Sequence, residues 1–349
     1  MKALKKIFKI TSISFLLLLV SLTLYACASV PKLSKEEKQI ITEVVKAPIP
    51  EIIKGKTGIT TSQGHNIWFE SIPPKGISKG AVILIMGNGN DALTWPPNFI
   101  SSLTGKGYQV IRFDHRGTGL STSEEKWKKK KAYSLNDMAD DVIAILDTLK
   151  IQKTHIVGAS MGGMIAQIVA IENPNRTISL TSIMSSADVM DSELPPMSNE
   201  IVSQMVGAIL KHGFFGSKKG QIKRQIIQKR ILMGEATGEI DIRTMAETSL
   251  FNLKKRDGYK LMSARHHFEA IKNSKSRYEA LGKLEIPTLV IHGEEDPVMP
   301  ISHGKKMHSV MQNGDSLWIK NMGHDLPDMA LKEMIDKMIL NFEKGFTDN

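Results

Sequence analysis

The run Gly158-Ala159-Ser160-Met161-Gly162 constrains the fold of this chain more than any other stretch. It has the pattern G-x-S-x-G, follows the apolar run His155-Ile156-Val157 and leads into a second apolar run over 164–171. This context predicts a strand, a sharp turn at the serine and then a helix. Glycines suit both sides of such a turn because a side chain would crowd it. The serine hydroxyl should then face the helix N-terminus, which favours negative charge. The alternative is a serine that only caps the helix.

Strand-length apolar runs alternate with helical runs on both sides of this turn. We predict strands over 81–86, 108–113, 178–184 and 316–320, another beginning near 287, and helices over 99–105, 134–149 and 329–344. A hairpin is expected around Gln63-Gly64. Such alternation predicts an α/β fold with a mostly parallel central sheet and helices on both faces.

The alternation stops at about residue 187 and resumes near 284. Between these points the sequence offers helical stretches over 198–211, 221–233 and 258–271 but no strong strand. We therefore expect a core over 58–187 and 284–345, interrupted by a helical cap over 188–283. Residues 27–57 contain several prolines and no strong period, and we interpret them as a tether, in which residues 34–46 could form a short helix.

The first 26 residues have the features of a targeting segment. Four lysines lie within residues 1–9, an apolar stretch covers 10–26, and Leu24-Tyr25-Ala26 precedes Cys27, the single cysteine of the chain. This pattern resembles a bacterial lipoprotein signal peptide, which implies removal of 1–26, a lipid on Cys27 and a place in the cell envelope, outside the cytoplasm. An uncleaved membrane anchor is the alternative, because the apolar stretch is nearly long enough to span a bilayer.

Composition limits the size of the core and the kinds of partner that this chain can have. The chain has 349 residues, of which 41% are hydrophobic, so it can bury a large core. Its formal net charge of +10 suits an anionic membrane surface. No basic patch with interleaved aromatic residues supports nucleic-acid binding, and no histidine or cysteine spacing indicates a metal site.

Ser160, Asp296 and His324 each follow a predicted strand and occur in this order along the chain. Parallel strands end at one edge of a sheet, so the three side chains can converge. Serine becomes a nucleophile when a neutral histidine takes its proton, and a buried carboxylate orients that histidine. We expect the N–H groups of Met161 and Asn88 to form the oxyanion hole. Asp188, which follows the strand after Ser160, is the alternative acid.

The chain resembles the α/β-hydrolase superfamily of serine hydrolases and is most similar to its aclacinomycin methylesterase-like branch. The matching stretches are Ile85-Met86-Gly87-Asn88-Gly89, the run 111–121 that contains Asp114-His115-Arg116-Gly117, the run 158–167, the run 291–297 and Met322-Gly323-His324-Asp325-Leu326-Pro327. The chain departs from the commoner pattern at Met86, where His-Gly usually precedes the oxyanion loop, and at Asn88, which replaces an apolar residue.

This resemblance implies a hydrolase that cleaves carboxylic esters through an acyl-enzyme, without a cofactor, on a small and apolar ester substrate. Lipase, thioesterase or carbon–carbon hydrolase activity would fit the same fold. A binding protein without catalytic activity is a different class, and the presence of the whole Ser160, Asp296 and His324 set disfavours it. The oligomeric state and the identity of the ester do not follow from the sequence.

Overall fold

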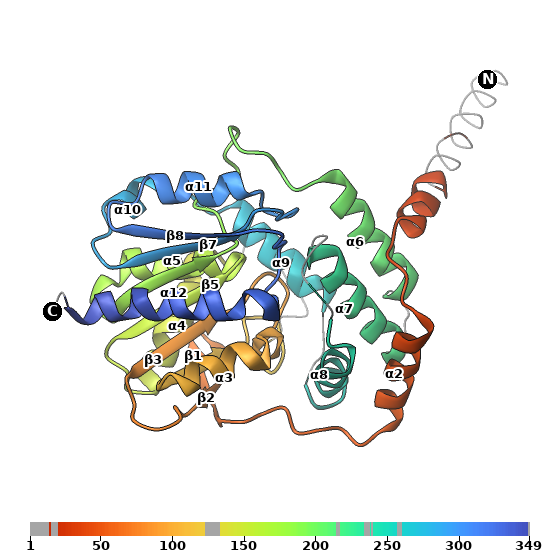
Figure 1. Cartoon of the computed structure of the whole chain (residues 1–349), viewed down its shortest axis with the longest axis horizontal. Coiled ribbons are helices and arrows are strands. Elements are labelled where there is room, and N and C mark those ends of the chain that lie inside the picture. Colours follow the sequence, from red (N-terminus) through yellow and green to blue (C-terminus); the bar gives the residue numbers. More distant parts are fainter. Residues whose placement is uncertain are drawn as a thin grey trace.

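The computed structural model describes residues 14, 20–122, 133–213, 217–233, 238, 240–256 and 260–347. Their strands form an eight-stranded sheet in the order β1-β2-β4-β3-β5-β6-β7-β8 (Figure 1). Pairing is antiparallel from β1 through β2 to β4 and parallel from β4 to β8. The strands are β1 (Lys56–Ser62), β2 (His65–Ile72), β3 (Gly80–Ile85), β4 (Tyr108–Phe113), β5 (Thr154–Ala159), β6 (Thr177–Ile183), β7 (Thr288–Gly293) and β8 (Gly314–Ile319).

Helices cover both faces of this sheet, as the alternation in the sequence predicts (Figure 1). One face packs against α4, α5, α10 and α11, and the other against α3 and α12. The helices of the core are α3 (Pro97–Gly105), α4 (Leu135–Thr148), α5 (Met161–Glu172), α11 (Ile301–Ser309) and α12 (Asp328–Thr347), with 3-10 turns at η1 (Ala92–Thr94) and η3 (Pro174–Arg176). The prediction of an α/β-hydrolase fold is therefore confirmed.

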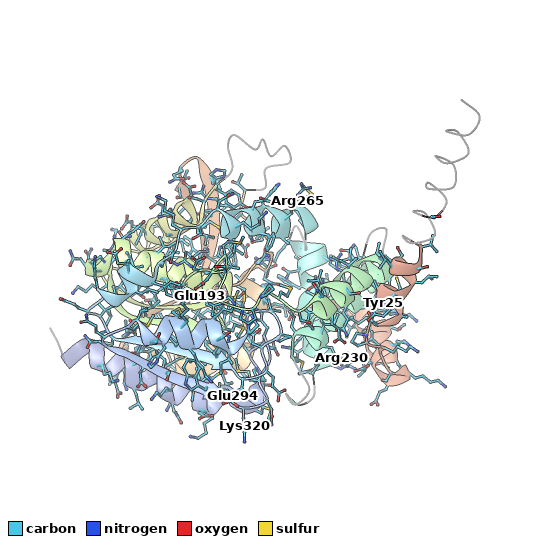
Figure 2. All side chains as sticks on the ribbon, turned by 90° about the horizontal axis from the view of Figure 1, so that it is seen from above. Tyr25, Glu193, Arg230, Arg265, Glu294 and Lys320 are labelled. Atoms are coloured by element: carbon cyan, nitrogen blue, oxygen red, sulfur yellow. The ribbon has the colours of Figure 1, made fainter. Side chains whose placement is uncertain are left out.

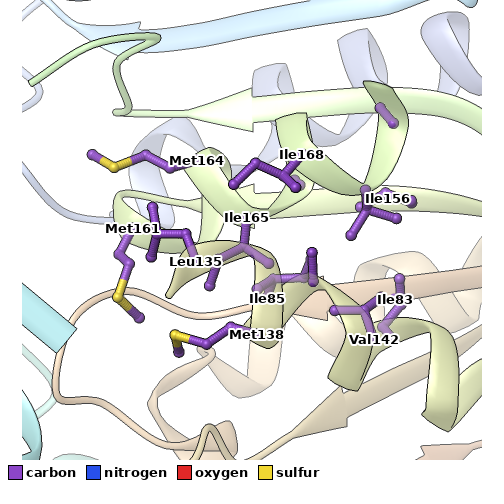
Figure 3. Close-up of a cluster of buried hydrophobic side chains, with 14 of the residues drawn as sticks. Ile83, Ile85, Leu135, Met138, Val142, Ile156, Met161, Met164, Ile165 and Ile168 are labelled. Carbon is purple, nitrogen blue, oxygen red and sulfur yellow. The ribbon is translucent and has the colours of Figure 1, made fainter. Parts of the chain in front are cut away.

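Strand β3 shows how the sequence specifies this layering. Its side chains are buried on both faces, because they alternate between two hydrophobic clusters. Ile83 and Ile85 join the cluster under α4 and α5, where they meet Met138 and Ile165 (Figure 3). Val82 and Leu84 point to the opposite side, under α3 and α12. A strand buried on both faces must be apolar throughout, which explains its continuous apolar run.

Helices α6 (Asn199–His212), α7 (Lys218–Met233), α8 (Ile242–Lys255), α9 (Leu261–Lys272) and α10 (Tyr278–Gly282) lie between β6 and β7. The described residues of this insertion include no strand. Helices α6, α7 and α8 form a hydrophobic cluster of their own, beside the core in Figure 1. The α9 residues Ala270 and Ile271 join the core cluster instead. We refer to α6–α9 as the cap.

The segment predicted to be a tether contains helix α2 (Lys35–Lys46), which packs against α7 and α8. Ser34 and Glu37 form a capping box at its start. Ile41 and Val44 on α2, together with Val30 before it, belong to the cap's hydrophobic cluster. Packing of this kind fixes the segment to the cap. Among the described residues, no helix combines the length and the apolar character needed to cross a bilayer; most of the predicted signal peptide lies outside them.

Candidate active site at the carboxyl ends of the strands

The turn between β5 and α5 holds Ser160 in a backbone conformation that few residues adopt, with φ of 56° and ψ of −123°. Glycine is required on both sides of it. A Cβ on Gly158 would collide with the backbone of Gly162, and one on Gly162 would collide with the carbonyl of Ile85 in β3. The main chain of Ser160 is fixed from two directions, since its N–H donates to Ile183 O at 2.9 Å and its carbonyl accepts from Ser185 Oγ at 2.8 Å.

The structure brings Ser160, His324 and Asp296 into one line of hydrogen bonds. His324 Nε2 lies 2.9 Å from Ser160 Oγ, and His324 Nδ1 lies 2.7 Å from Asp296 Oδ2. With the ring proton on Nδ1, the imidazole donates to the carboxylate and accepts the serine proton at Nε2. Ser160 and His324 are 164 residues apart in the sequence, and the ends of β5, β7 and β8 bring the three side chains together.

Asp296 is buried and held as a carboxylate. Burial opposes its ionisation, but the charge of His324 and hydrogen bonds from His292 and His324 outweigh that effect, so the pKa of Asp296 lies well below its usual range. Its second oxygen accepts from the N–H groups of Val298 and Met299 at 2.9 and 2.8 Å. An anion fixed in this way can orient His324 and stabilise its cation.

Asp188, the alternative acid, is engaged elsewhere. Its Oδ1 accepts from the N–H of Met190 at 2.8 Å, and Arg277 lies near it. Both ring nitrogens of His324 are occupied by Ser160 and Asp296. His292, inside β7, donates from Nε2 to Met299 O at 2.7 Å and supports the loop that carries Asp296.

The predicted oxyanion loop follows β3 and passes beside the serine. A Cβ on Gly87 would lie 3.1 Å from Ser160 Cβ, so a side chain there would push the loop or the serine away by a few tenths of an ångström. Asn88 comes next in this loop. Met161 is the first residue of α5, and its N–H is among the four that a helix leaves without an intrahelical acceptor. Asn88, next to Gly87, and Met161, next to Ser160, both lie close to the serine, while their role as oxyanion-hole donors stays a prediction.

The cap reaches this site from two directions. At the end of α7, the carbonyls of Leu232 and Met233 accept hydrogen bonds from the N–H groups of His324 and Gly323 at 2.7 and 3.0 Å. Lys229 of α7 adds an ion pair with Asp325 at 2.7 Å. The loop that carries His324 is therefore attached to the cap as well as to β8.

On the other side, α9 contacts the oxyanion loop. His267 Nδ1 accepts from the N–H of Gly89 at 3.0 Å, and His267 Nε2 donates to Arg116 O at 2.9 Å. Burial lowers the pKa of His267 to about 3, and the nearby His115 adds to this effect. The ring therefore stays neutral, with one nitrogen that accepts a hydrogen bond and one that donates. His115 itself donates from Nε2 to Met86 O at 2.7 Å, and burial lowers its pKa to about 4.

Arg256, at the end of α8, forms a third link between cap and core. Its guanidinium pairs with Asp114, which also accepts from the N–H groups of Ala92 and Leu120. Burial raises the pKa of Asp114 to about 7 against the opposing effect of Arg256. Losing either partner would leave a buried polar group uncompensated, so this pair helps to fix the cap over the site.

Two family models match the chain. One, described as the alpha/beta hydrolase fold, covers residues 80–228, and the other, described as TAP-like protein, covers residues 267–344. The chain is 27% identical over 316 residues to rhodomycin D methylesterase DauP of Streptomyces sp. (strain C5), covering 83% of this chain and 99% of that protein. It is 25% identical to a bifunctional esterase/perhydrolase of Acinetobacter calcoaceticus, covering 81% and 98%.

The chain has the α/β-hydrolase fold, and its sequence resembles the α/β-hydrolase superfamily. Within it, the rhodomycin methylesterase relatives support the branch that the sequence motifs indicate. The fold also matches a crystal structure described as a membrane phospholipase A, with a TM-score of 0.62, 16% identity and coverage of 97% of this chain and 99% of that one. That likeness is one of fold alone.

Sequence reasoning misses the role of His267 in this hydrolase. No local sequence pattern links a histidine in a helix to a loop 178 residues away, so the sequence gives no sign of this contact. For His115 the sequence does indicate a role near the site, because His115 lies in the Asp114-His115-Arg116-Gly117 motif. No group of three or more His, Cys, Asp or Glu residues within the described ranges could hold a metal ion.

We expect replacement of His267 with phenylalanine to lower kcat by about 10- to 100-fold with little change in KM, because a loop displaced by an ångström loses much of its transition-state contact. Glutamine can accept from Gly89 and donate to Arg116, so His267→Gln should recover part of the loss. His155→Phe is the matched control, since His155 is also buried but lies on β5 stacked on Phe342. Steady-state kinetics on one ester would check all three. Equal losses in His267→Phe and His155→Phe would contradict this role.

Proposed function

We propose that this chain, a hydrolase of carboxylic esters, cleaves its substrate through an acyl-enzyme on Ser160, with His324 as general base and acid and Asp296 as the orienting carboxylate. The observation that carries the proposal is the unbroken line of hydrogen bonds from Asp296 through His324 to Ser160, 2.7 and 2.9 Å long. The half-buried Ser160 at the N-terminus of α5 supports it, because the helix favours negative charge at that point.

In the first half of the proposed reaction, His324 Nε2 takes the proton of Ser160 Oγ as the oxygen attacks the ester carbonyl carbon. The carbonyl oxygen becomes an oxyanion, which accepts hydrogen bonds from the N–H groups of Met161 and Asn88. The carbon–oxygen bond to the leaving alcohol then breaks, and the alcohol takes the proton from His324. The acyl group remains on Ser160.

In the second half, water takes the place of the alcohol. His324 removes a proton from the water as its oxygen attacks the acyl carbon, and a second oxyanion forms in the same place. The bond to Ser160 Oγ breaks, the serine regains a proton from His324, and the carboxylic acid leaves. Asp296 stays ionised throughout and stabilises the imidazolium in both halves.

The experiment is a panel of methyl and p-nitrophenyl esters of increasing acyl-chain length, with the parent chain measured beside Ser160→Ala. The names of the relatives favour methyl esters. We expect the parent chain to hydrolyse these esters and Ser160→Ala not to. The ester that the parent hydrolyses fastest would identify the substrate class. Ester turnover that survives in Ser160→Ala would contradict the proposed mechanism.

We also propose that the chain is held in a bacterial cell envelope through a lipid on Cys27. The support is the sequence before Cys27, four lysines and then an apolar stretch, together with the absence of a second cysteine. Cys27→Ser should either release a mature-size chain from the membrane or leave an unprocessed precursor. Fractionation and intact-mass measurement would check this. An unchanged mass with unchanged membrane binding would favour an uncleaved anchor instead.

A further inference from the structure

Helix α6 presents an apolar face to solvent. Val202, Val206 and Leu210 recur at every fourth position, so they lie on one side of the helix, and each is 45% exposed. The opposite side of α6 is already used, because Ala208 joins the cap's hydrophobic cluster. The helix already has its packing partners, yet it exposes three large apolar side chains in a row. Such an exposed apolar stripe indicates an interaction surface.

The N-terminal segment leaves the molecule beside this stripe. Ala26 and Val30 are buried against α6 at Gly207, where any Cβ would collide with Ala26 O, and Lys211 Nζ donates to Cys27 O at 3.4 Å. Residues 20–28 are helical and run away from the body next to α6, with Tyr25 at the cap end of the molecule (Figures 1 and 2). Whether the anchor is a lipid on Cys27 or the uncleaved apolar segment, it starts next to Gly207, the chain neighbour of Val206.

Positive charge lies near the Leu210 end of this stripe, around His212. Helix α7 contains six basic residues and no acidic one, and Lys211 lies in the last turn of α6. Burial lowers the pKa of Lys223, and the nearby Lys219 and Lys38 add to this effect. Burial likewise lowers the pKa of His212, with Lys211 and Lys223 adding to it. No ion pair between described residues neutralises Lys38, Lys211, Lys219 or Lys223. A cluster of lysines without carboxylate partners attracts anions.

We propose that the α6 face, defined by Val202, Val206 and Leu210 and with Lys211, Lys219 and Lys223 near its Leu210 end, lies on the surface of an anionic lipid bilayer. Apolar side chains flanked by lysines are what a helix needs to lie in the headgroup region of such a membrane. The nearby anchor holds the face at the bilayer, so a weak interaction is enough. Because α7 and α9 contact the loops of His324 and Asn88, the docked cap stands between the membrane and the active site. This arrangement would favour esters that partition into the bilayer.

The test uses the full chain in liposomes, with a polarity-sensitive fluorophore on one introduced cysteine. Val206→Cys and Leu210→Cys report on the α6 face. Leu340→Cys, exposed on α12, is the matched control, because α12 packs on the core and is separate from α6 (Figure 1). The parent chain gives the background from Cys27. We expect a blue shift and quenching by doxyl-labelled lipids at 206 and 210 but not at 340, stronger with phosphatidylglycerol than with phosphatidylcholine alone.

A second variant separates lipid docking from the other occupant that an apolar face could have, a second copy of this chain. Lys219→Glu combined with Lys223→Glu should return quenching at 206 to the level seen with phosphatidylcholine. Labelling of Ser160 by a fluorophosphonate should stay unchanged, which shows that the fold is intact. Equal exposure of the probes at 206 and 340 overturns the proposal. So does a blue shift that rises with protein density but is insensitive to quenching lipids, because that result assigns the face to self-association. Neither outcome would contradict the proposed roles of Ser160, His324 and Asp296.

Discussion

Replacing Ser160 with alanine is expected to lower kcat for ester hydrolysis by about 10³- to 10⁶-fold, because nothing else can hold the acyl group. His324→Ala should cost nearly as much. The three groups act as a unit, so the double variant should be about as slow as either single one. Thermal unfolding should change little, since the substitution removes a single hydroxyl whose partner is the catalytic histidine. Initial rates under substrate excess, with active-site titration of the parent, would measure these losses.

Ser309→Ala is the matched control for that experiment. Its hydroxyl donates to Lys306 O on the exposed side of α11, away from the site, and its loss should leave turnover within about twofold of the parent. Rates for Ser160→Ala that equal those of Ser309→Ala would show that Ser160 is not the nucleophile. A double variant much slower than either single one would argue against a shared proton path.

The second large effect is expected at Asp296. Asparagine has nearly the same shape but supplies a neutral oxygen and an NH₂ group, so it can favour the wrong tautomer of His324 and cannot stabilise the imidazolium. A loss of about 10⁴-fold in kcat is typical of this substitution in such a triad. The loss should shrink as pH rises, because hydroxide can then help to remove the serine proton. A pH–rate profile of Asp296→Asn beside the parent would measure both features.

Asp188→Asn is the variant that separates the two carboxylates. Asp188 accepts from the N–H of Met190, whereas His324 is bonded to Ser160 and Asp296, so we expect a change in rate below about tenfold and some loss of stability. If Asp188→Asn loses most of its activity while Asp296→Asn stays active, the triad acid is Asp188, which follows β6. It would leave Ser160 and His324 in their roles.

Much of the core can be predicted because the same residues satisfy several constraints at once. The apolar run 81–86 predicts a strand buried on both faces, and β3 is such a strand over Gly80–Ile85. Ser134 and Asp137 indicate the start of α4, and they form its capping box. The order of Ser160, Asp296 and His324, each after a strand, indicates that they meet, because parallel strands end at one edge of a sheet.

The cap can be predicted only in outline. The helical stretches predicted for the cap do not include α8, and no helix is predicted where α11 lies. The packing of α2 on α7 and α8 depends on distant contacts, such as the ion pair between Glu37 and Arg230, which are 193 residues apart. No local period encodes which faces meet. For the same reason the link from His267 to the oxyanion loop is visible only in three dimensions.

The most direct test of the proposed mechanism is to locate the adduct that a fluorophosphonate leaves on the purified chain. The reagent phosphonylates a serine only where a neighbouring base activates it, so the label reports the proposed proton path as well as the nucleophile. We predict one adduct per chain, on the peptide that contains Ser160, lost in Ser160→Ala and strongly slowed in His324→Ala. An adduct on another serine, or an unlabelled chain that still turns over esters at the parent rate, would contradict the assignment of Ser160 as the nucleophile.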